Sequence, residues 1–432
     1  MTEVYSNLPT SRAPADASSR PAACADTPFW VFIEIMKIRQ NLIRILTLLP
    51  VLSSLAVFAA AGAAQKGEYI LFVGTYTEEG SKSKGIYSYQ YDAQTGKVTP
   101  LGLAAETTNP SWVTIHPNGR FLYAVNEVGN YKGSNDGGLS AFSIDRDKDG
   151  HPTGKLTLLN EVPTHGADPC YVTVDKTGKY ALVANYTGAS IAVIRIAEDG
   201  SLGIGSSVMF HTGHSANPQR QRSAHVHSVD LSPDNRFAYV DDLGIDGLLV
   251  YKFDDSKGTL VSNSSKYATF DPGAGPRHFA LHPSGKFAYV VSEMQGTVTA
   301  FSNDPATATL QRLQTVSILP KDFKGEIEGA ELKIHPSGKF LYASNRGDGN
   351  SIAVFSIDAD NGTLSPVEYI PTQGKTPRSF EIDPTGTRLF VGNQGSNNIV
   401  VFRIDQKTGR LTPTGQVFDQ ASPVCLKFLK IE

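Results

Sequence analysis

The chain has 432 residues, a formal net charge of −3 and 19% charged residues, with 40 glycines and 25 prolines. It has neither a basic excess nor a basic run, which argues against a nucleic-acid partner, since phosphate binding requires clustered Lys and Arg. The low charge and high glycine and proline content are typical of a protein of many short strands and turns, and not of a disordered chain.

The N-terminal region resembles a leader and not part of a folded domain. From Met36, basic residues are followed by a long uncharged apolar run that ends in small residues. This order predicts a signal peptide over residues 36–64, with cleavage near Ala64 and a periplasmic or secreted product that no longer touches the membrane. An uncleaved membrane anchor is the alternative, because the run is long enough to span a bilayer. Residues 1–35 are then a start-site extension or a disordered leader, with Met36 as the true start.

From residue 66 onward the sequence is built from repeats. A motif of one turn and one hydrophobic strand occurs six times without gaps, and a further strand pattern follows about twenty residues after each start. The copies begin at Ile115, Val174, Leu231, Leu281, Ile334 and Ile382. Their β-branched and aromatic runs are bounded by Asn-Gly, Thr-Gly or Ser-Gly turns. Four short antiparallel strands in about 50 residues is the size of one β-propeller blade.

Two incomplete repeats lie at the ends of this region. Tyr69–Tyr76 matches the second strand of a repeat whose first strand is missing, and Ser422–Leu429 matches a first strand with nothing after it. The two fragments complement each other, and closing a ring in this way leaves no free sheet edge. The sequence therefore predicts an all-β, seven-bladed β-propeller over residues 66–432, a single domain whose last blade is closed by the N-terminal strand. We expect it to be a monomer.

The cysteines and histidines give no sign of a disulfide or a metal site. Cys170 and Cys425 lie on first strands of distant blades, so we expect two buried free thiols. His225 and His227 are two residues apart, as metal ligands on one strand face can be, but no third ligand is evident. We therefore expect no metal.

Aligning the six copies with one another separates uniform positions from variable ones. The second residue of each copy precedes a turn and is His, Asp or Ser, so we assign it to turn hydrogen bonding. The twelfth residue is Asn in four copies, and we assign it mainly to backbone contacts between blades. Its counterpart in the third copy, Asp242, is kept as a candidate for substrate binding.

Two variable columns are predicted to open on the same solvent-filled channel mouth. One lies four residues before each copy, where the innermost strand begins, and holds Ser111, Cys170, His227, Arg277, Ala330 and Arg378. The other lies twelve residues after each start, where the adjacent antiparallel strand ends, and holds Tyr76, Glu127, Tyr186, Leu243, Glu293, Arg346 and Gln394. Structural columns of a repeat stay uniform, so these variable polar side chains indicate a ligand site.

Several short motifs contain or adjoin these positions. They are Ala-His-Val-His-Ser (224–228), Val-Asp-Asp-Leu-Gly-Ile-Asp (240–246), Gly-Pro-Arg-His (275–278), Val-Ser-Glu (291–293), Ser-Asn-Arg-Gly (344–347) and Pro-Arg (377–378). Together they resemble the bacterial seven-bladed lactonase family, over residues 69–429. That family includes propeller-type 6-phosphogluconolactonases and is similar to the carboxy-cis,cis-muconate lactonising enzyme. The resemblance implies cofactor-free opening or closing of a lactone ring in a small-molecule substrate.

The resemblance also implies catalytic roles for four of the variable residues, His227, Arg277, Glu293 and Arg346. Lactone hydrolysis needs a base for water and a donor for the developing oxyanion. A histidine with a pKa near 6.5 can be that base, and arginines offer forked donors. Glu293 would orient the histidine or pair with an arginine, and a purely structural inter-blade ion pair is the alternative. The candidate substrate-binding residues are His225, Glu127, Tyr186, Asp242, Arg378 and Gln394.

We therefore predict a hydrolase of carbohydrate metabolism that opens a sugar-acid or related lactone by general-base attack of water. One feature departs from the 6-phosphogluconolactonases, because their phosphorylated substrate belongs to the cytoplasm and this chain carries an export signal. Either the substrate is a different, unphosphorylated lactone, or the activity differs. A non-catalytic propeller that binds a ligand or a protein at its channel mouth and a lactonising cycloisomerase stay open as alternatives.

Overall fold

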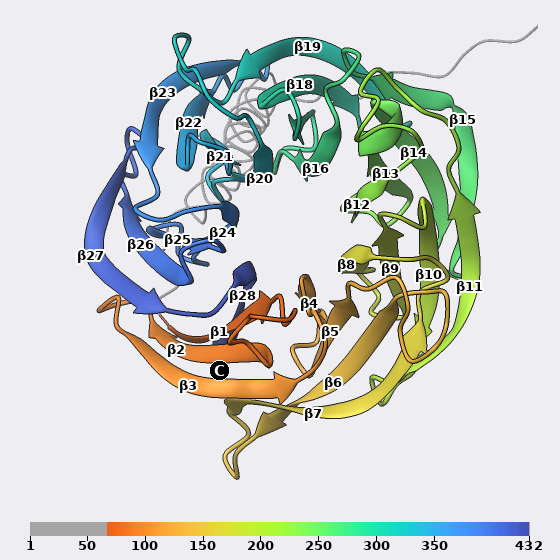
Figure 1. Cartoon of the computed structure of the whole chain (residues 1–432), viewed down its shortest axis with the longest axis vertical. Helices are drawn as coiled ribbons and strands as arrows, with labels where there is room; N and C mark the ends of the chain where they lie inside the picture. The colour runs from red at the N-terminus through yellow and green to blue at the C-terminus, as the bar shows by residue number, and fades with distance from the viewer. Residues whose placement is uncertain (1–66, 432) are drawn as a thin grey trace, which may run out of the picture. The chain divides into compact units, whose positions relative to one another are not determined.

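The computed structural model describes residues 67–431, so the predictions for residues 1–35 and for the signal peptide at 36–64 lie outside the described residues. Within 67–431 the chain forms β-strands and one short 3-10 helix, η1 (Leu243–Ile245). The strands make seven four-stranded antiparallel sheets, set as blades around a central axis (Figure 1). The prediction of an all-β, seven-bladed propeller is confirmed. No helix in this part of the chain is long and apolar enough to cross a membrane.

Six blades are each built from four consecutive strands, with the first strand innermost. The first blade consists of β4 (Val113–Ile115), β5 (Phe121–Asn126), β6 (Gly138–Arg146) and β7 (Pro152–Pro163). The second consists of β8 (Pro169–Val174), β9 (Tyr180–Asn185), β10 (Ser190–Ile196) and β11 (Leu202–Phe210). The third consists of β12 (Val226–Leu231), β13 (Phe237–Asp242), β14 (Gly247–Asp254) and β15 (Thr259–Thr269). The fourth consists of β16 (Pro276–Leu281), β17 (Phe287–Ser292), β18 (Thr297–Asp304) and β19 (Thr309–Ser317). The fifth consists of β20 (Gly329–Ile334), β21 (Phe340–Asn345), β22 (Ser351–Ile357) and β23 (Leu364–Pro371). The sixth consists of β24 (Pro377–Ile382), β25 (Arg388–Asn393), β26 (Asn398–Ile404) and β27 (Leu411–Asp419).

The seventh blade, which we call the closing blade, combines both ends of the described chain. Its innermost strand is the C-terminal β28 (Pro423–Ile431), followed by β1 (Glu68–Thr75), β2 (Gly85–Asp92) and β3 (Val98–Glu106). β1 and β28 pair antiparallel along their whole length, from Glu68 opposite Ile431 to Thr75 opposite Pro423. The predicted closure by the N-terminal strand is confirmed.

The second strand of each blade is the most deeply buried. Strands such as β5, β13, β17 and β21 are buried at every position, because the neighbouring blades cover both of their faces. A strand covered on both faces reads as a continuous hydrophobic run, which is why the repeat was visible in the sequence. The outermost strands alternate instead between exposed and partly buried residues, as in β27.

The uniform histidines join one blade to the next. In three copies the Nε2 atom lies 2.8–2.9 Å from a glycine carbonyl oxygen in the turn of the following blade, and the pairs are His116–Gly178, His282–Gly338 and His335–Gly386. Gly178 has φ +74°, and a Cβ there would lie 2.3 Å from the His116 Nε2 atom. In His282 and His335 the Nδ1 atom lies 2.8 Å from a serine hydroxyl of the same turn. The turn role predicted for this position is confirmed, and the structure adds a contact between blades.

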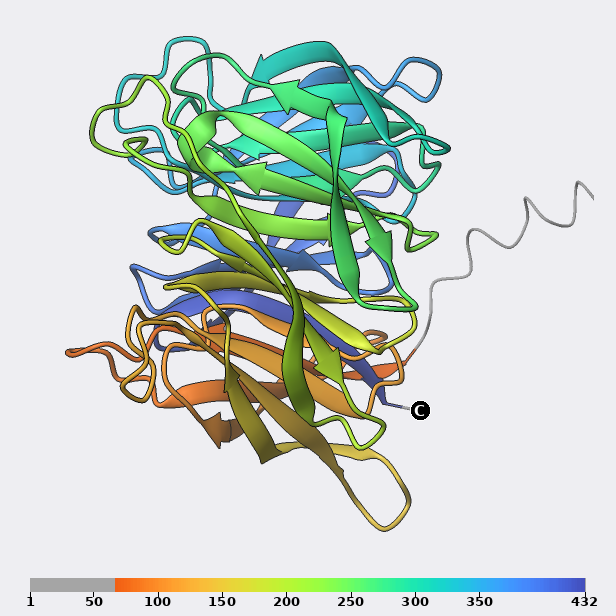
Figure 2. The same cartoon turned by 90° about the vertical axis from the view of Figure 1, so that its right-hand side faces the viewer.

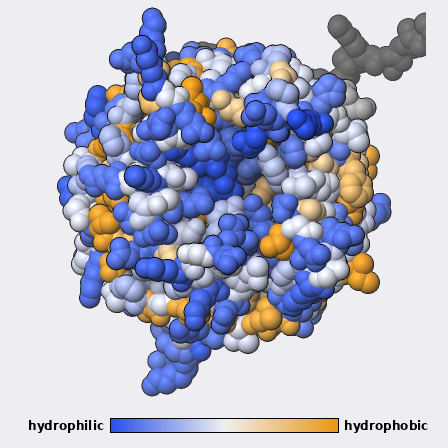
Figure 3. Space-filling model, viewed as in Figure 1, coloured by the Kyte–Doolittle hydropathy of each residue, from blue (hydrophilic) through white to orange (hydrophobic). Residues whose placement is uncertain are grey.

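Three long loops project from one side of the propeller. Residues 77–84, 211–225 and 318–328 extend from the left-hand side in Figure 2. Viewed along the axis from that side, the molecule is hollowed at its centre, and hydrophilic residues surround the hollow (Figure 3).

Cys170 and Cys425 are both buried and free, as predicted.

Candidate active site

A polar cavity of about 310 Å³ lies where the two variable columns meet. It is lined by Tyr76, Glu127, Cys170, Tyr186, Arg220, His227, Glu293, Glu328, Arg346 and Arg378. Eight of these belong to the variable columns, and together they come from all seven blades, which places the cavity on the axis of the ring. The prediction that both columns open on one mouth is confirmed. A larger hollow of about 500 Å³ lies elsewhere, beside Glu68, Gln90 and His151, but no arginine lines it.

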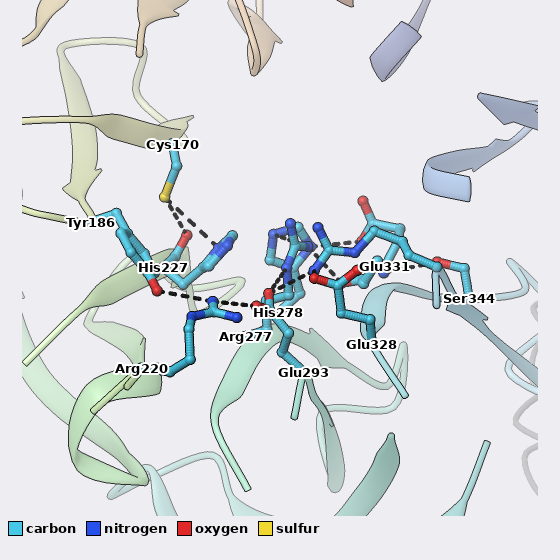
Figure 4. A network of polar contacts seen from close by, with 12 residues as sticks. Cys170, Tyr186, Arg220, His227, Arg277, His278, Glu293, Glu328, Glu331 and Ser344 are labelled. Atoms are coloured by element: carbon cyan, nitrogen blue, oxygen red, sulfur yellow. Dashed lines mark hydrogen bonds and ion pairs between the residues drawn. The ribbon is translucent and has the colours of Figure 1, made fainter. Parts of the chain in front are cut away.

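Glu293 is the centre of a cluster of ion pairs (Figure 4). Its Oε1 accepts a hydrogen bond from Arg220 Nη2 at 2.6 Å and its Oε2 accepts one from Arg277 Nε at 2.9 Å. Arg346 Nη2 lies 2.9 Å from the same Oε2. Although burial alone would raise the pKa of Glu293, the guanidinium groups of Arg346 and Arg277 hold it well below its usual range. Glu293 is therefore a permanent anion and a poor base.

The two predicted catalytic arginines differ in what they can offer a ligand. Arg277 is only 2% exposed, is not among the residues that line the cavity, and donates to the Ala330 carbonyl at 2.7 Å as well as to Glu293. Burial, with the charge of Arg346, lowers the pKa of Arg277 to about 10, which still leaves it charged at neutral pH. Arg346 does line the cavity. Its Nε and Nη2 atoms are buried and have no hydrogen-bond partner among the described residues, because the contact to Glu293 has ion-pair distance without hydrogen-bond geometry. Nη2 is also ion-paired with Glu328 at 3.4 Å, so the guanidinium is held by two carboxylates while part of its hydrogen-bonding capacity is unused.

His227 is buried in the wall of the cavity and not solvated at an open mouth. Its ring meets Tyr186 and His278 edge-on, with centroids 5.6 and 5.1 Å away, and its Nδ1 atom lies 3.8 Å from the Cys170 sulfur. Burial, reinforced by the charge of Arg277, holds the pKa of His227 well below 6.5. The expectation of a near-normal pKa is therefore wrong. The imidazole is neutral at physiological pH and has a lone pair to accept a proton, although the lowered pKa makes it a weaker base than a free histidine.

The opposite wall is formed by Glu127 and Arg378. Both Glu127 carboxylate oxygens lie 2.9 Å from the Tyr76 hydroxyl, and the Ser111 hydroxyl donates to one of them. The Arg378 guanidinium lies over the Tyr76 ring, 5.2 Å from its centroid. Both charged side chains line the cavity and are within reach of a bound ligand.

The remaining predicted residues lie around or outside the cavity. His225 stacks on the Tyr186 ring at 4.5 Å, behind the cavity wall. The structure does not bring Gln394 or Asp242 into the cavity. Asp242 is completely buried, and its carboxylate caps η1 through Gly244 N, accepts from His225 N and lies 2.7 Å from His211 Nδ1. Its acceptors are used within the fold, so it has none to offer a substrate.

Two lining residues were missed in the sequence, Arg220 and Glu328. Both lie on long loops between blades, at 211–225 and 318–328, where the repeat alignment has no column. The only available signal was the presence of charged residues in the longest insertions. Among residues 67–431, no group of three His, Cys, Asp or Glu side chains is arranged to hold a metal ion.

The seven-bladed ring, whose axial cavity is lined by histidine, arginine and glutamate, matches the propeller lactonases along almost its whole length. The family described as "Lactonase, 7-bladed beta-propeller" matches residues 70–428. The chain therefore belongs to the seven-bladed β-propeller lactonases and is an enzyme of that family.

Curated relatives and solved structures agree with this assignment. The 6-phosphogluconolactonase of Bacillus subtilis (strain 168) is 38% identical over 362 residues, which cover 84% of this chain and 99% of the relative. The 6-phosphogluconolactonase of Formosa agariphila is 34% identical over 343 residues, 79% of this chain and 94% of the relative. The structure of a periplasmic gluconolactonase of Pseudomonas aeruginosa is 35% identical, with a TM-score of 0.78 over 84% of this chain and all of that one.

Proposed function

We propose that the protein hydrolyses the ring ester of an unphosphorylated sugar-acid lactone, without a cofactor, in the axial cavity. The observation that carries the proposal is the pairing, in one cavity, of a neutral imidazole with the guanidinium of Arg346, whose Nε and Nη2 donors make no hydrogen bond within the described residues. A base for water and a donor for the oxyanion are the two groups that ester hydrolysis requires.

The chemistry is assigned to His227 and Arg346. His227 takes a proton from water as the water oxygen bonds to the lactone carbonyl carbon, and the charge that develops on the carbonyl oxygen is held by Arg346. The ring carbon–oxygen bond then breaks, the carbonyl re-forms, and the proton on His227 passes to the ring oxygen that leaves as a hydroxyl. The product is the open hydroxy acid. Glu293 and Arg277 act as positioning residues, since their ion pairs fix the guanidinium groups in place.

Three observations favour a substrate without a phosphate group. The cavity is lined by three arginines and also by three glutamates, Glu127, Glu293 and Glu328, which oppose the binding of a dianion. A periplasmic gluconolactonase is among the similar structures, and the apolar run after Met36 has the order of an export signal. A cavity of about 310 Å³ is at the lower end of the range for small-molecule sites, roughly 300–1,000 Å³, and suits a single sugar ring.

A titration of released acid tests this proposal. The purified protein is given δ-gluconolactone, its 6-phosphate and unrelated lactones at constant pH, and the base consumed is recorded above the uncatalysed rate. We expect turnover of the unphosphorylated sugar lactone to exceed that of the phosphate. Dialysis against EDTA should leave the rate unchanged. Saturable binding of a lactone with no acid released would instead support the non-catalytic alternative, and ring closure of an open acid would support the cycloisomerase.

A further inference from the structure

Arg220 differs from the other arginines of the cavity in where it comes from and in how much of it is free. It lies on the loop 211–225 between two blades, whereas the others lie on or directly after strands. Its side chain is 41% exposed. Both of its side-chain hydrogen bonds, to Glu293 Oε1 and to the Tyr186 hydroxyl, use Nη2. The Nε–H and Nη1–H donors of this guanidinium are therefore available to a ligand.

The loop is tied down directly beside Arg220. The Gln221 side chain is buried, and its Nε2 donates to the Leu243 carbonyl and to Asp246 Oδ1, each at 2.8 Å. The Ser215 hydroxyl, on the same loop, donates to Asp246 Oδ2. One carboxylate thus accepts two hydrogen bonds from the segment that carries Arg220.

The same carboxylate also holds the turn that precedes Arg277. Gly275 N donates to Asp246 Oδ1 and Gly273 N to Asp246 Oδ2, each at 2.6 Å. The Gly275 carbonyl in turn accepts from Glu293 N at 2.7 Å. Asp246 is buried and ends η1 with φ 50°, and its carboxylate accepts four hydrogen bonds, two from side chains of the 211–225 loop and two from main-chain N–H groups of the turn before Arg277. It belongs to the Val240–Asp246 motif, to which the proposed mechanism gives no role.

We propose that Arg220 is a substrate-contacting, specificity-determining residue and that Asp246 is the positioning residue that holds it over the cavity. Asp246 fixes the Arg220 loop against the turn before Arg277, and this sets the Arg220–Glu293 contact. The Arg220 guanidinium then binds an oxygen of the substrate from the loop side. The substrate contact rests on the proposed lactonase function, whereas the anchoring does not.

A double-mutant cycle tests the coupling between the two residues. Arg220→Ala should raise KM for the best lactone about tenfold or more, as loss of a charge-assisted hydrogen bond does, and change kcat by less than about threefold. Asp246→Asn should raise KM similarly, because an amide NH₂ replaces one acceptor that faces N–H donors. In the Arg220→Ala background Asp246→Asn should add less than about twofold. Additive effects, or an unchanged KM in Arg220→Ala, would overturn the proposal.

Asp175→Asn is the matched control. Asp175 is also a buried carboxylate, and it accepts main-chain and side-chain hydrogen bonds from Thr177, Lys179, Tyr180 and Asn235. It lies directly after the C-terminal end of β8, whereas Cys170, which lines the cavity, lies near the start of that strand. The Asp175→Asn variant should have a lower melting temperature than the wild type and an unchanged KM. If Asp246→Asn fails to fold, Gln221→Leu removes the loop's hydrogen bond to Asp246 nearest Arg220, leaves those of Ser215, Gly273 and Gly275 in place, and should raise KM in the same direction.

Trypsin cleavage tests the anchoring without any assay of activity. Cutting after Arg220 and Arg222, identified by mass spectrometry, should be about tenfold faster in Asp246→Asn than in the wild type, because the loop opens more often. In Asp175→Asn it should be unchanged. Equal cleavage in Asp246→Asn and the wild type would refute the anchoring. A wild type that hydrolyses no lactone would refute the proposed function and the substrate contact, and trypsin would still decide the role of Asp246.

Discussion

His227 is the residue on which the proposed chemistry depends most. It is 4% exposed, neutral and in the wall of the cavity. We expect His227→Ala to lower kcat by about 100-fold or more, as loss of a general base does. Steady-state kinetics on the purified variant measure this. Full activity in His227→Ala would remove the proposed base.

His282→Ala is the control for that variant. This histidine lies at the uniform turn position, and its Nε2 contacts Gly338 of the next blade and not the cavity. The variant should lose about 1 kcal/mol of unfolding free energy, the typical contribution of one hydrogen bond, and keep its kcat. Thermal unfolding and the same kinetic assay together separate the two histidines.

Arg277 illustrates how burial changes the expected result of a mutation. At a solvent-filled mouth its removal would cost little stability, but the structure buries it between Glu293 and the Ala330 carbonyl. Arg277→Ala should therefore destabilise the fold by about 3 kcal/mol, because a buried carboxylate loses a partner. Denaturant titration measures the loss. A variant as stable as the wild type would show that Glu293 is held sufficiently by its other arginines.

A second buried group of carboxyls, on β12 and β13, should make stability depend on pH. Burial raises the pKa of Asp230 from 3.8 to about 6, and burial together with the charge of Asp230 raises that of Asp241 well above 3.8. The folded state thus holds these protons more tightly than the unfolded chain. Their stabilising contribution is present below about pH 3.8 and is lost as the pH rises through about 6.

Asp241→Asn tests this pH dependence. The amide cannot ionise, so the variant should be more stable than the wild type by about 1 kcal/mol at pH 8 and should show a smaller advantage at pH 4. Ser228 can still donate to the amide oxygen, as it does to Asp241 Oδ2. Melting curves at both pH values give the comparison. An advantage that is equal at the two values would contradict the raised pKa.

At the scale of the elements, the closing blade is the most vulnerable part of the propeller. β1 pairs with β2 on one side and with β28 on the other, and its Leu71 and Val73 are completely buried. Deleting residues 66–78 would expose the edges of both neighbours and the apolar faces of the adjacent blades. The truncated protein should aggregate or melt more than about 10 °C lower, measured by light scattering and calorimetry. An unchanged melting temperature would contradict the closure.

At the scale of the whole molecule, the N-terminal sequence determines the compartment in which we expect the protein to act. The order of charges and apolar residues after Met36 favours export, with cleavage near Ala64. We therefore expect protein isolated from the native host to begin close to residue 65 and to be found outside the cytoplasm. N-terminal sequencing of that material decides the matter, and a chain that begins at Met1 would refute cleavage.

The sequence by itself determined the architecture of this protein and most of the cavity wall. Each blade buries its second strand on both faces, so the same hydrophobic run recurs and its period gives the blades, their number and the closure at the two ends. The two variable columns follow from strand direction alone, because neighbouring antiparallel strands start and end at the same edge. For that reason the two columns hold eight of the ten lining residues, and six of these were among the candidate site residues, including His227, Glu293 and Arg346.

Only the tertiary structure decided how these residues are solvated and which of them remain free for a ligand. His227 and Arg277 are buried because seven blades converge on the axis, a degree of crowding that no single repeat encodes. Asp242 shares a repeat column with four asparagines, yet its carboxylate is engaged by η1, His225 and His211. Arg220 and Glu328 reach the cavity from loops of irregular length. A loop's path depends on contacts such as those of Asp246 with distant segments, and a repeat pattern contains no information about them.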